Sequence, residues 1–413
     1  MLLDLLTKKT PPLTGKHREI LQKQVIDDNQ PGTILRDVAT MLKFIGDAGH
    51  PVTNANKWLT TKSLGPLNDQ MARPIRLINT HRPQQKSYSN IHGLYLVLRC
   101  SGLLGIIKNK TRTLLVVDEQ MLEAWTALNP TERYFSLLET WLLRSNDEVI
   151  GNQVSAFLEL SQLHKISRFV HSLPTDGADA TNFTNFDNDL RFNIGLHHMA
   201  LLEMFDLVSI QQNTSKGSKG WAIRKISRTQ YGDALLRLLA PLDDALDRNQ
   251  PANDAPPGIQ SVVQPLFPEC RHIMTVPVHE FKDGVYIFTV SLGKSWRRIA
   301  VPGSLVFESL SDAILQTFGF DHNHLYRFGF RDPLGIEQHI DHPYLEDGSP
   351  TTTEMAIGDV PLVPGSIMTY YYDFGDNWEF EIILDTIQPP NLTFKTPKVL
   401  EKHGTAPEQY PEW

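Results

Sequence analysis

Cysteine is scarce in this chain of 413 residues, where only Cys100 and Cys270 are present. Two cysteines can form neither a disulfide framework nor a cysteine-rich zinc site, which favours a reducing compartment. No apolar run approaches the roughly 18 residues of a membrane span. The first residues also lack the basic and long apolar regions of a secretory signal. We therefore expect a cytoplasmic protein without a membrane partner.

The sequence also lacks the motifs that bind nucleotide cofactors or activate a nucleophile. Gly293-Lys294-Ser295 has no glycine five residues before its Gly-Lys pair, so it is not a phosphate loop. Neither a G-x-G-x-x-G fingerprint nor a G-x-S-x-G elbow occurs. Asp373-Phe374-Gly375 copies one kinase motif, but the other kinase motifs are absent, so we interpret it as a tight turn in which Gly375 takes a positive φ. We predict a non-catalytic protein without a cofactor.

Charges of opposite sign occupy different parts of the chain, although Asp and Glu outnumber Lys and Arg by only 47 to 39. Residues 51–117 contain ten Lys and Arg but a single acid, Asp69. Residues 301–413 contain five basic residues and 18 acidic ones. The basic stretch suits a polyanion such as duplex DNA, because Lys and Arg on phosphates release counterions. The acidic stretch suits a basic protein partner, and both blocks are also compatible with ordinary solvated surfaces.

Composition and apolar spacing predict a multidomain protein with a mainly α N-terminal part. The segment Asn249–Gly258 contains three prolines and no bulky apolar residue, which predicts a linker. Before it, apolar residues recur at steps of three and four, as in Leu35–Ile45, which predicts helices. The predicted parts are a helical domain at 1–148, a second helical unit at 149–248, the linker at 249–260 and a final domain at 261–413.

Two segments before the linker have the same predicted order of elements. Ile91–Leu128 and Ile194–Leu239 each read as a helix, a short hairpin with a polar or basic turn, and a second helix. This is the order at the end of a winged-helix unit, in which the helix before the hairpin lies in the major groove and the hairpin contacts phosphates. Residues 33–45, 52–59 and 64–71 would supply the remaining helices of the first unit. Such winged-helix-like units also serve as protein–protein modules.

Basic residues in and before these hairpins are the candidate nucleic-acid contacts. Phosphate contacts from the hairpin turns are expected from Lys108, Lys110, Arg112, Lys216 and Lys219. The approach to the nucleic acid would be lined by Arg73, Arg76, Arg82 and Lys86. Contacts of this kind position a protein on duplex DNA without specifying a base sequence.

After the linker, the apolar period changes towards two, which indicates strands. The expected strands are Tyr286–Leu292, Arg298–Val301, Leu325–Phe330, Ile367–Asp373 and Trp378–Leu384. Between the second and third strands, Leu310, Ile314 and Phe318 share one helix face, and Gly319 ends that helix. This order predicts an α+β, β-grasp-like domain with a helix laid across a mixed sheet.

The last third of the chain, from about residue 270, resembles the plasmid pRiA4b Orf-3-like family, whose members are also labelled TnpR-like. The most specific stretch is Tyr370–Trp378, which follows a Y-x-Y-D-F-G-D-x-W signature. The signature residues are Trp296, His324, Tyr326, Tyr370, Tyr372, Asp373, Phe374, Gly375, Asp376 and Trp378. The sequence departs from the family at Phe380, where histidine is frequent. The resemblance implies a bacterial mobile-element or defence setting, and no activity to transfer.

Histidines and aspartates in the acidic domain form the candidate metal ligands. They are His322, His324, His339 and His342, with Asp321 and Asp341 beside two of them. Such side chains can bind a divalent ion, so a metal-dependent, nuclease-like enzyme is one alternative. Without cysteines or an H-E-x-x-H helix, however, we expect no metal site. We favour a non-catalytic nucleic-acid-associated or regulatory protein, and a protein–protein adaptor using the acidic domain is the other alternative.

Overall fold

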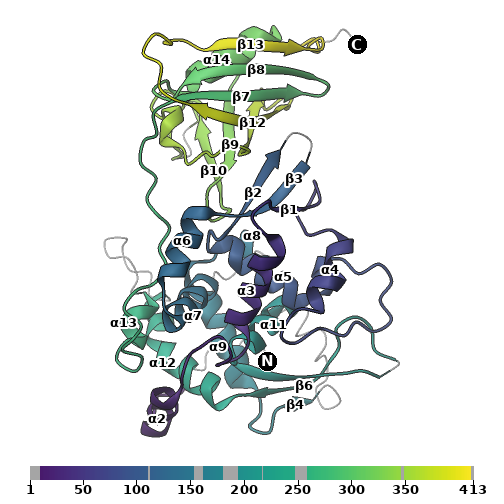
Figure 1. Cartoon of the computed structure of the whole chain (residues 1–413), viewed down its shortest axis with the longest axis vertical. Helices are drawn as coiled ribbons and strands as arrows, with labels where there is room; N and C mark the ends of the chain where they lie inside the picture. Colours follow the sequence, from purple (N-terminus) through teal and green to yellow (C-terminus); the bar gives the residue numbers. More distant parts are fainter. Residues whose placement is uncertain are drawn as a thin grey trace. The chain divides into compact units, whose positions relative to one another are not determined.

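The chain forms two compact units in the structure, which is a computed structural model (Figure 1). Unit 1 comprises residues 1–104 and 115–275, and unit 2 comprises residues 105–114 and 276–413. The described residues are 10–109, 112–152, 161–179, 194–215, 217–246, 258–345 and 348–410. None of the helices in these ranges is both long and apolar enough to cross a membrane.

Unit 1 is mainly helical, as the apolar spacing predicts. Besides the two repeated segments described next, of which residues 105–114 belong to unit 2, it contains α2 (Gly15–Lys23), α3 (Ile34–Ile45), β1 (His50–Pro51), α4 (Thr61–Asn68), α7 (Pro130–Glu139), a π-helical segment (Thr140–Arg144), α8 (Asp147–Ile150), α9 (Gln162–Ser172), β4 (Ala178–Asp179) and α13 (Ile259–Val263). Residues 52–59, which we expected to be helical, instead form a turn closed by an antiparallel bridge between Val52 and Leu59. Its two asparagines and Thr53 favour a turn, and Lys57 has a φ of 57°.

Both predicted helix–hairpin–helix segments are present in the structure. The first is α5 (Ser89–Cys100), β2 (Leu104–Asn109), β3 (Arg112–Val117) and α6 (Glu119–Ala127), and the second is α11 (Leu196–Met204), β5 (Val208–Gln212), β6 (Ile223–Arg228) and α12 (Gln230–Leu246). In each segment the residue before the second helix caps it. Asp118 accepts a hydrogen bond from the Met121 amide, and Thr229 accepts one from the Gly232 amide. These local signals explain why the sequence predicted both segments well.

The helices before the two hairpins, α5 and α11, pack against each other inside unit 1. All residues of α5 are buried, as are six of the nine in α11. Gly93 permits this close contact, because a Cβ at that position would lie 2.8 Å from the carbonyl oxygen of His197. A helix that reads a major groove must expose one face to the bases. In this arrangement α5 has no such face, contrary to the role that the winged-helix pattern predicted for it.

Three histidines lie at the α5–α11 contact. The His197 ring centroid is 5.6 Å from that of His92 and 4.0 Å from that of His198. Trp141 donates a hydrogen bond to His198 Nδ1 at 2.9 Å, and His198 Nε2 donates to Asn152 Oδ1 at 2.8 Å, which suits a neutral ring. Burial lowers the pKa of His92 to about 3 and that of His197 to about 4, and it lowers the pKa of His198 strongly. All three rings are therefore neutral at pH 7.

Unit 2 contains a seven-stranded sheet and one long helix. Its elements are β7 (Val285–Leu292), β8 (Ser295–Pro302), α14 (Phe307–Phe318), β9 (Tyr326–Arg331), β10 (Glu337–Asp341), β11 (Ile367–Tyr372), β12 (Trp378–Gln388) and β13 (Lys398–His403). The strand order is β10-β9-β11-β12-β7-β8-β13. All six neighbouring pairs are antiparallel, whereas we expected a mixed sheet. The crossover through α14 joins β8 to β9, which run parallel, but β7, β12 and β11 lie between them, so no neighbouring strands are parallel.

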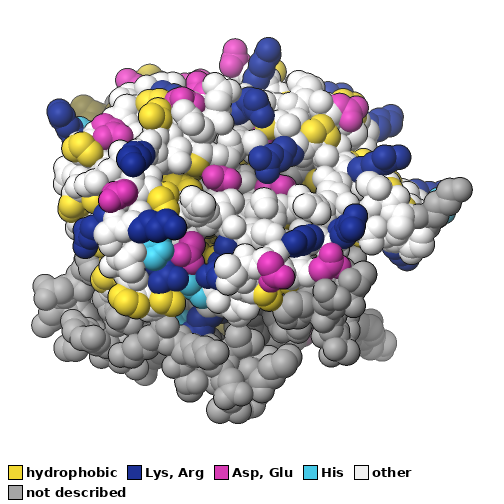
Figure 2. Space-filling view, turned by 90° about the horizontal axis from the view of Figure 1, so that it is seen from below, with side chains coloured by type: hydrophobic (Ala, Val, Ile, Leu, Met, Phe, Trp, Pro, Cys, Tyr) yellow, Lys and Arg dark blue, Asp and Glu magenta, His cyan; other side chains and the backbone are white. Residues whose placement is uncertain are grey.

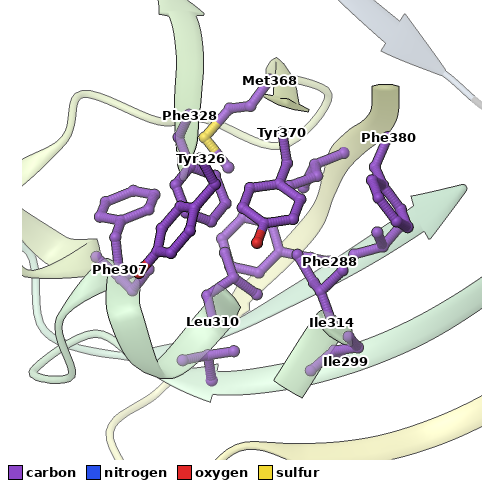
Figure 3. Packing of buried hydrophobic residues seen from close by; sticks show 14 of the residues in the cluster. Phe288, Ile299, Phe307, Leu310, Ile314, Tyr326, Phe328, Met368, Tyr370 and Phe380 are labelled. Carbon is purple, nitrogen blue, oxygen red and sulfur yellow. The ribbon is translucent and has the colours of Figure 1, made fainter. Parts of the chain in front are cut away.

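The core of unit 2 lies between α14 and one face of this sheet. Figure 3 shows Leu310 and Ile314 of the helix facing Phe288, Tyr370 and other aromatic side chains of the strands. The apolar alternation along β7 therefore marks the buried face, as the sequence predicted, and each such side chain contributes roughly 1.5–3 kcal/mol of burial free energy. Phe380, at the position where the family often has histidine, is fully buried in this core.

The boundary between the compact units lies at residues 275 and 276, beyond the expected linker. Residues 247–257, which include most of that linker, are outside the described residues. The segment that follows belongs to unit 1, because α13 packs against α7 and α12. The ring of Phe267 also contacts that of Phe135, with centroids 5.0 Å apart. Composition alone did not reveal that the apolar residues after the prolines complete the helical unit.

Candidate functional site

Two segments that carry predicted basic contacts pair with each other in unit 1. Ile78 and Gly220 exchange backbone hydrogen bonds of 3.0 and 2.7 Å, which pairs the segment after α4 with the loop between β5 and β6. The Arg76 amide also donates to Gln212 Oε1 at 3.1 Å. Arg76 and Lys219 are both exposed and lie next to this bridge in the sequence. We call residues 76–79, 212–215 and 217–220 the basic edge.

Other predicted contacts are paired or lie elsewhere. Arg73 forms an ion pair with Glu203 at 3.0 Å. Lys108 forms an ion pair with Glu381 at 2.5 Å, and both of these residues belong to unit 2. The ammonium group of Lys86 lies 5.1 Å from the centre of the Trp58 ring. Arg82 and Arg112 are exposed. Lys110 and Lys216 lie outside the described residues. Carboxylate pairing weakens the case for Arg73 and Lys108 as phosphate contacts.

The surface charge of the face in Figure 2 is mixed. Lys and Arg side chains there alternate with Asp and Glu side chains instead of forming one area of positive charge. A large cationic surface on this face is therefore not a basis for nucleic-acid binding. The basic edge is smaller than such a surface, and it is formed by the pairing of two segments that are far apart in the sequence.

The signature tyrosines of unit 2 are part of its core. Tyr326, Tyr370 and Tyr372 are buried, and the Tyr370 ring centroid lies 4.6 Å from that of Phe328. The Tyr370 hydroxyl forms a 2.7 Å hydrogen bond with Ser311 of α14. Among the remaining signature residues, Trp296 stacks on His403 and Trp378 packs against Phe320. These aromatic side chains stabilise the sheet and do not form a base-stacking platform.

The signature turn Asp373–Asn377 connects β11 to β12. Asp373 Oδ1 accepts hydrogen bonds from the amides of Gly375 at 3.0 Å and Asp376 at 3.4 Å. The positive φ angles are those of Asp373 and Asn377, at 55° and 53°, and not that of Gly375 as we expected. Asp and Asn tolerate this conformation because their side chains bond to nearby backbone. At the tip, Phe374 is 47% exposed.

A network of hydrogen bonds joins the signature turn to the C-terminal segment. His324 lies between Asp373 and Tyr410, with 3.1 Å from Nδ1 to the carboxylate and 2.8 Å from Nε2 to the phenol oxygen. The Tyr410 hydroxyl donates to Asp321 Oδ2 at 2.6 Å. Tyr372 and Gln409 donate to Asp321 Oδ1 at 2.8 and 3.1 Å. We call these six residues the signature network.

The chemistry of the signature network favours anchoring over catalysis. The hydrogen bond from Tyr410, with those from Gln409 and Tyr372, holds the pKa of Asp321 well below its usual range despite some desolvation. Such a carboxylate is a weak base. The same hydrogen bond to Asp321 raises the pKa of Tyr410 to about 12, so its hydroxyl is a weak nucleophile at pH 7. The network is suited to holding residues 404–410 against the sheet.

The candidate metal ligands of unit 2 have separate partners. Asp312 pairs with His322, Asp373 with His324, Glu337 with His339, and Arg327 with Asp341. His342 packs between the rings of Tyr326 and Tyr344. In the part of the chain that the structure describes, no group of three His, Cys, Asp or Glu side chains is arranged to hold a metal ion. These residues are therefore close together in the sequence, but they do not form one cluster in the structure.

Sequence reasoning missed the residues that complete these arrangements. Gln409 and Tyr410 reach Asp321 across 88 and 89 positions in the sequence, and Glu203 reaches Arg73 across 130. No local spacing signals such partners.

Comparison with known proteins concerns the C-terminal part of the chain. Residues 286–410 match the family described as plasmid pRiA4b ORF-3-like protein, which confirms the resemblance and its location. The chain is 30% identical over 116 residues to "Uncharacterized protein y4hQ" of Sinorhizobium fredii (strain NBRC 101917 / NGR234), a match that covers 27% of this chain and 57% of that relative. The crystal structure of a protein of unknown function, MM3350 from Methanosarcina mazei Go1, is 26% identical and covers 31% of this chain and 73% of that chain, with a TM-score of 0.28.

Proposed function

We propose that this protein is a non-catalytic nucleic-acid-associated or regulatory protein that contacts the phosphate backbone through the basic edge. The pairing of Ile78 with Gly220 carries this proposal, because it joins the two segments that carry Arg76 and Lys219, which are far apart in the sequence. Both side chains are exposed, and neither has an ion-pair partner among the described residues. Phosphate contacts of this kind give affinity without base specificity.

In this proposal, the two helix–hairpin–helix segments are winged-helix-like units that bind through their hairpins. Helices α5 and α11 are buried against each other, so the groove-reading role of such helices is not used. The polar turn between β5 and β6 supplies Lys219 to the basic edge. The description of unit 2 as β-grasp-like is likewise a proposal, supported by one helix packed across a sheet. The family resemblance supports a mobile-element or defence setting.

A titration with duplex DNA tests the proposal. We expect a labelled duplex to bind the full chain at about 50 mM salt and to lose affinity steeply as salt rises. The double variant Arg76→Glu with Lys219→Glu should bind at least about tenfold more weakly, with a salt slope smaller by roughly two. Arg271→Glu, another exposed position in unit 1, is the matched control and should bind like the wild type. Absence of binding at low salt, or equal affinity of the double variant, would refute the proposal.

A protein–protein adaptor is the second candidate, and exposed aromatic residues of unit 2 favour it. Tyr344 is 81% exposed and Phe374 is 47% exposed, in a region with 18 acidic and five basic residues. Aromatic residues are enriched at protein interfaces, and the acidic charge would suit a basic partner. A partner that co-purifies at fixed stoichiometry despite nuclease treatment, and is lost in Tyr344→Ala with Phe374→Ala, would support the adaptor.

The metal-dependent enzyme remains the third candidate, and it has the least structural support because the histidines of unit 2 have separate partners. Metal analysis of the purified protein tests it directly. A stoichiometric bound ion, or nuclease activity with added magnesium or manganese, would favour this candidate over the other two.

A further inference from the structure

Asp233 of α12 lies at the centre of a cluster of basic side chains in unit 1. Its carboxylate oxygens are 2.9 Å from Arg228 Nη1 and 2.9 Å from Arg237 Nε. His17 Nε2 is 3.3 Å away and His171 Nε2 is 3.8 Å away. These side chains come from α2, α9, β6 and α12. We call the five residues the Asp233 cluster.

The Asp233 cluster contains more positive charge than negative charge. Two arginines, which stay charged, share one carboxylate, so the excess is one charge with both histidines neutral and three with both protonated. Four of the five side chains are 10–18% exposed, and that of Arg228 is 20% exposed. Within the described ranges, no second carboxylate lies within ion-pair distance of these basic groups. Partial burial of an uncompensated positive charge is costly, and an anionic ligand would remove that cost.

A second observation concerns the unused nitrogen of His171. Nδ1 lies 2.8 Å from the Ser167 carbonyl oxygen, to which it must donate a hydrogen bond. Nε2 is buried and has no hydrogen-bond partner among the described residues, because Asp233 is too far away for one. The side chain is 10% exposed, and burial lowers its pKa, with the two arginines acting in the same direction. A neutral His171 therefore presents an acceptor that lacks a donor.

We propose that the Asp233 cluster binds a phosphate-type oxyanion, either inorganic phosphate or a phosphoryl group of a larger molecule. Its negative oxygens compensate the two guanidinium groups, which bind phosphate through paired N–H donors. A hydroxyl of hydrogen phosphate donates to His171 Nε2. Arg228 lies at the opposite end of β6 from the basic edge, so this inference does not depend on the proposed function.

Calorimetric titration of the full chain with inorganic phosphate, at constant ionic strength set with chloride, tests the site. The wild type should bind one phosphate saturably. Arg228→Gln and Arg237→Gln should each weaken that binding at least tenfold, whereas Arg271→Gln, an exposed arginine elsewhere in unit 1, should change it less than twofold. The folded fraction of each variant is checked by circular dichroism.

Asp233→Asn separates a binding site from a merely structural ion cluster. Removal of the competing carboxylate should tighten phosphate binding at least threefold, although the protein loses ion pairs. His171→Gln, which keeps both arginines, provides a milder variant and should weaken binding. A folded wild type without saturable phosphate binding, or an Arg228→Gln variant with wild-type affinity, would overturn the proposal.

A second binding experiment, with a short DNA duplex, shows whether the bound phosphoryl group belongs to a small molecule or to nucleic acid. If phosphate binds and Arg228→Gln leaves duplex affinity unchanged, the ligand is free phosphate or a small phosphorylated molecule. If Arg228→Gln weakens duplex binding and inorganic phosphate competes with the duplex, the ligand is the nucleic-acid backbone. Either result supports the oxyanion site, while the basic-edge variants report separately on the proposed function.

Discussion

Acidification from pH 7 to pH 5 should destabilise unit 1, because the histidines at the α5–α11 contact are buried as neutral rings. Burial lowers the pKa of His92 to about 3, with a further contribution from His197, whose own pKa burial lowers to about 4. In the unfolded chain both values return to about 6.5. As pH falls below 6.5, the unfolded chain takes up protons and the folded protein does not. Stability is therefore lost with falling pH, and the loss levels off only near the folded pKa values.

The magnitude follows from these pKa values. At pH 5 each of the two histidines is almost fully protonated in the unfolded chain and almost fully neutral in the folded protein. Each then contributes a loss of about 2 kcal/mol relative to pH 7, or about 4 kcal/mol together, from 1.36 kcal/mol per pKa unit. His198 acts in the same direction. A loss of this size is a large share of the 5–15 kcal/mol that typically stabilises a domain.

Hydrogen exchange read by mass spectrometry measures this loss in unit 1 alone. After correction for intrinsic exchange rates, peptides from α5 and α11 should lose about a thousandfold in protection between pH 7 and pH 5. His197→Gln removes one titrating ring and keeps a donor for the Ile150 carbonyl, so its loss should be smaller by roughly thirtyfold, the equivalent of about 2 kcal/mol. Peptides from β7 in unit 2 serve as the internal control. Unchanged protection at pH 5, or an equally steep loss in the variant, would refute the reasoning.

Two further predictions concern close packing and the signature network. Gly93→Ala places a Cβ 2.8 Å from the His197 carbonyl oxygen, so it should destabilise unit 1 by about 1–3 kcal/mol in urea unfolding; an unchanged midpoint would contradict the tight α5–α11 contact. Tyr410→Phe removes the hydroxyl that bonds Asp321 and His324, so it should weaken the anchoring of residues 404–410 and speed their proteolysis. Tyr344→Phe, at an exposed tyrosine outside the network, is the matched control.

Local patterns were sufficient for most secondary structure. The alternation in Tyr286–Leu292 and the helical spacing of Leu310, Ile314 and Phe318 depend on neighbouring residues, and both elements are present as predicted. The edge strands β10 and β13 were missed because they carry many polar and charged residues and no clear alternation of apolar ones. Edge strands are often of this kind, since only one side of each is paired.

The amino-acid sequence by itself determined most of the helices and strands, the division of charge and the family that the C-terminal third resembles. Those properties depend on residues that are close together in the chain. The tertiary structure decided that α5 is buried against α11, that the segment of Arg76 pairs with the segment of Lys219, that Arg73 is paired with Glu203, and that four basic side chains surround Asp233. These outcomes depend on contacts between residues many positions apart, and the free energy of each depends on burial and charge that exist only after the segments have packed.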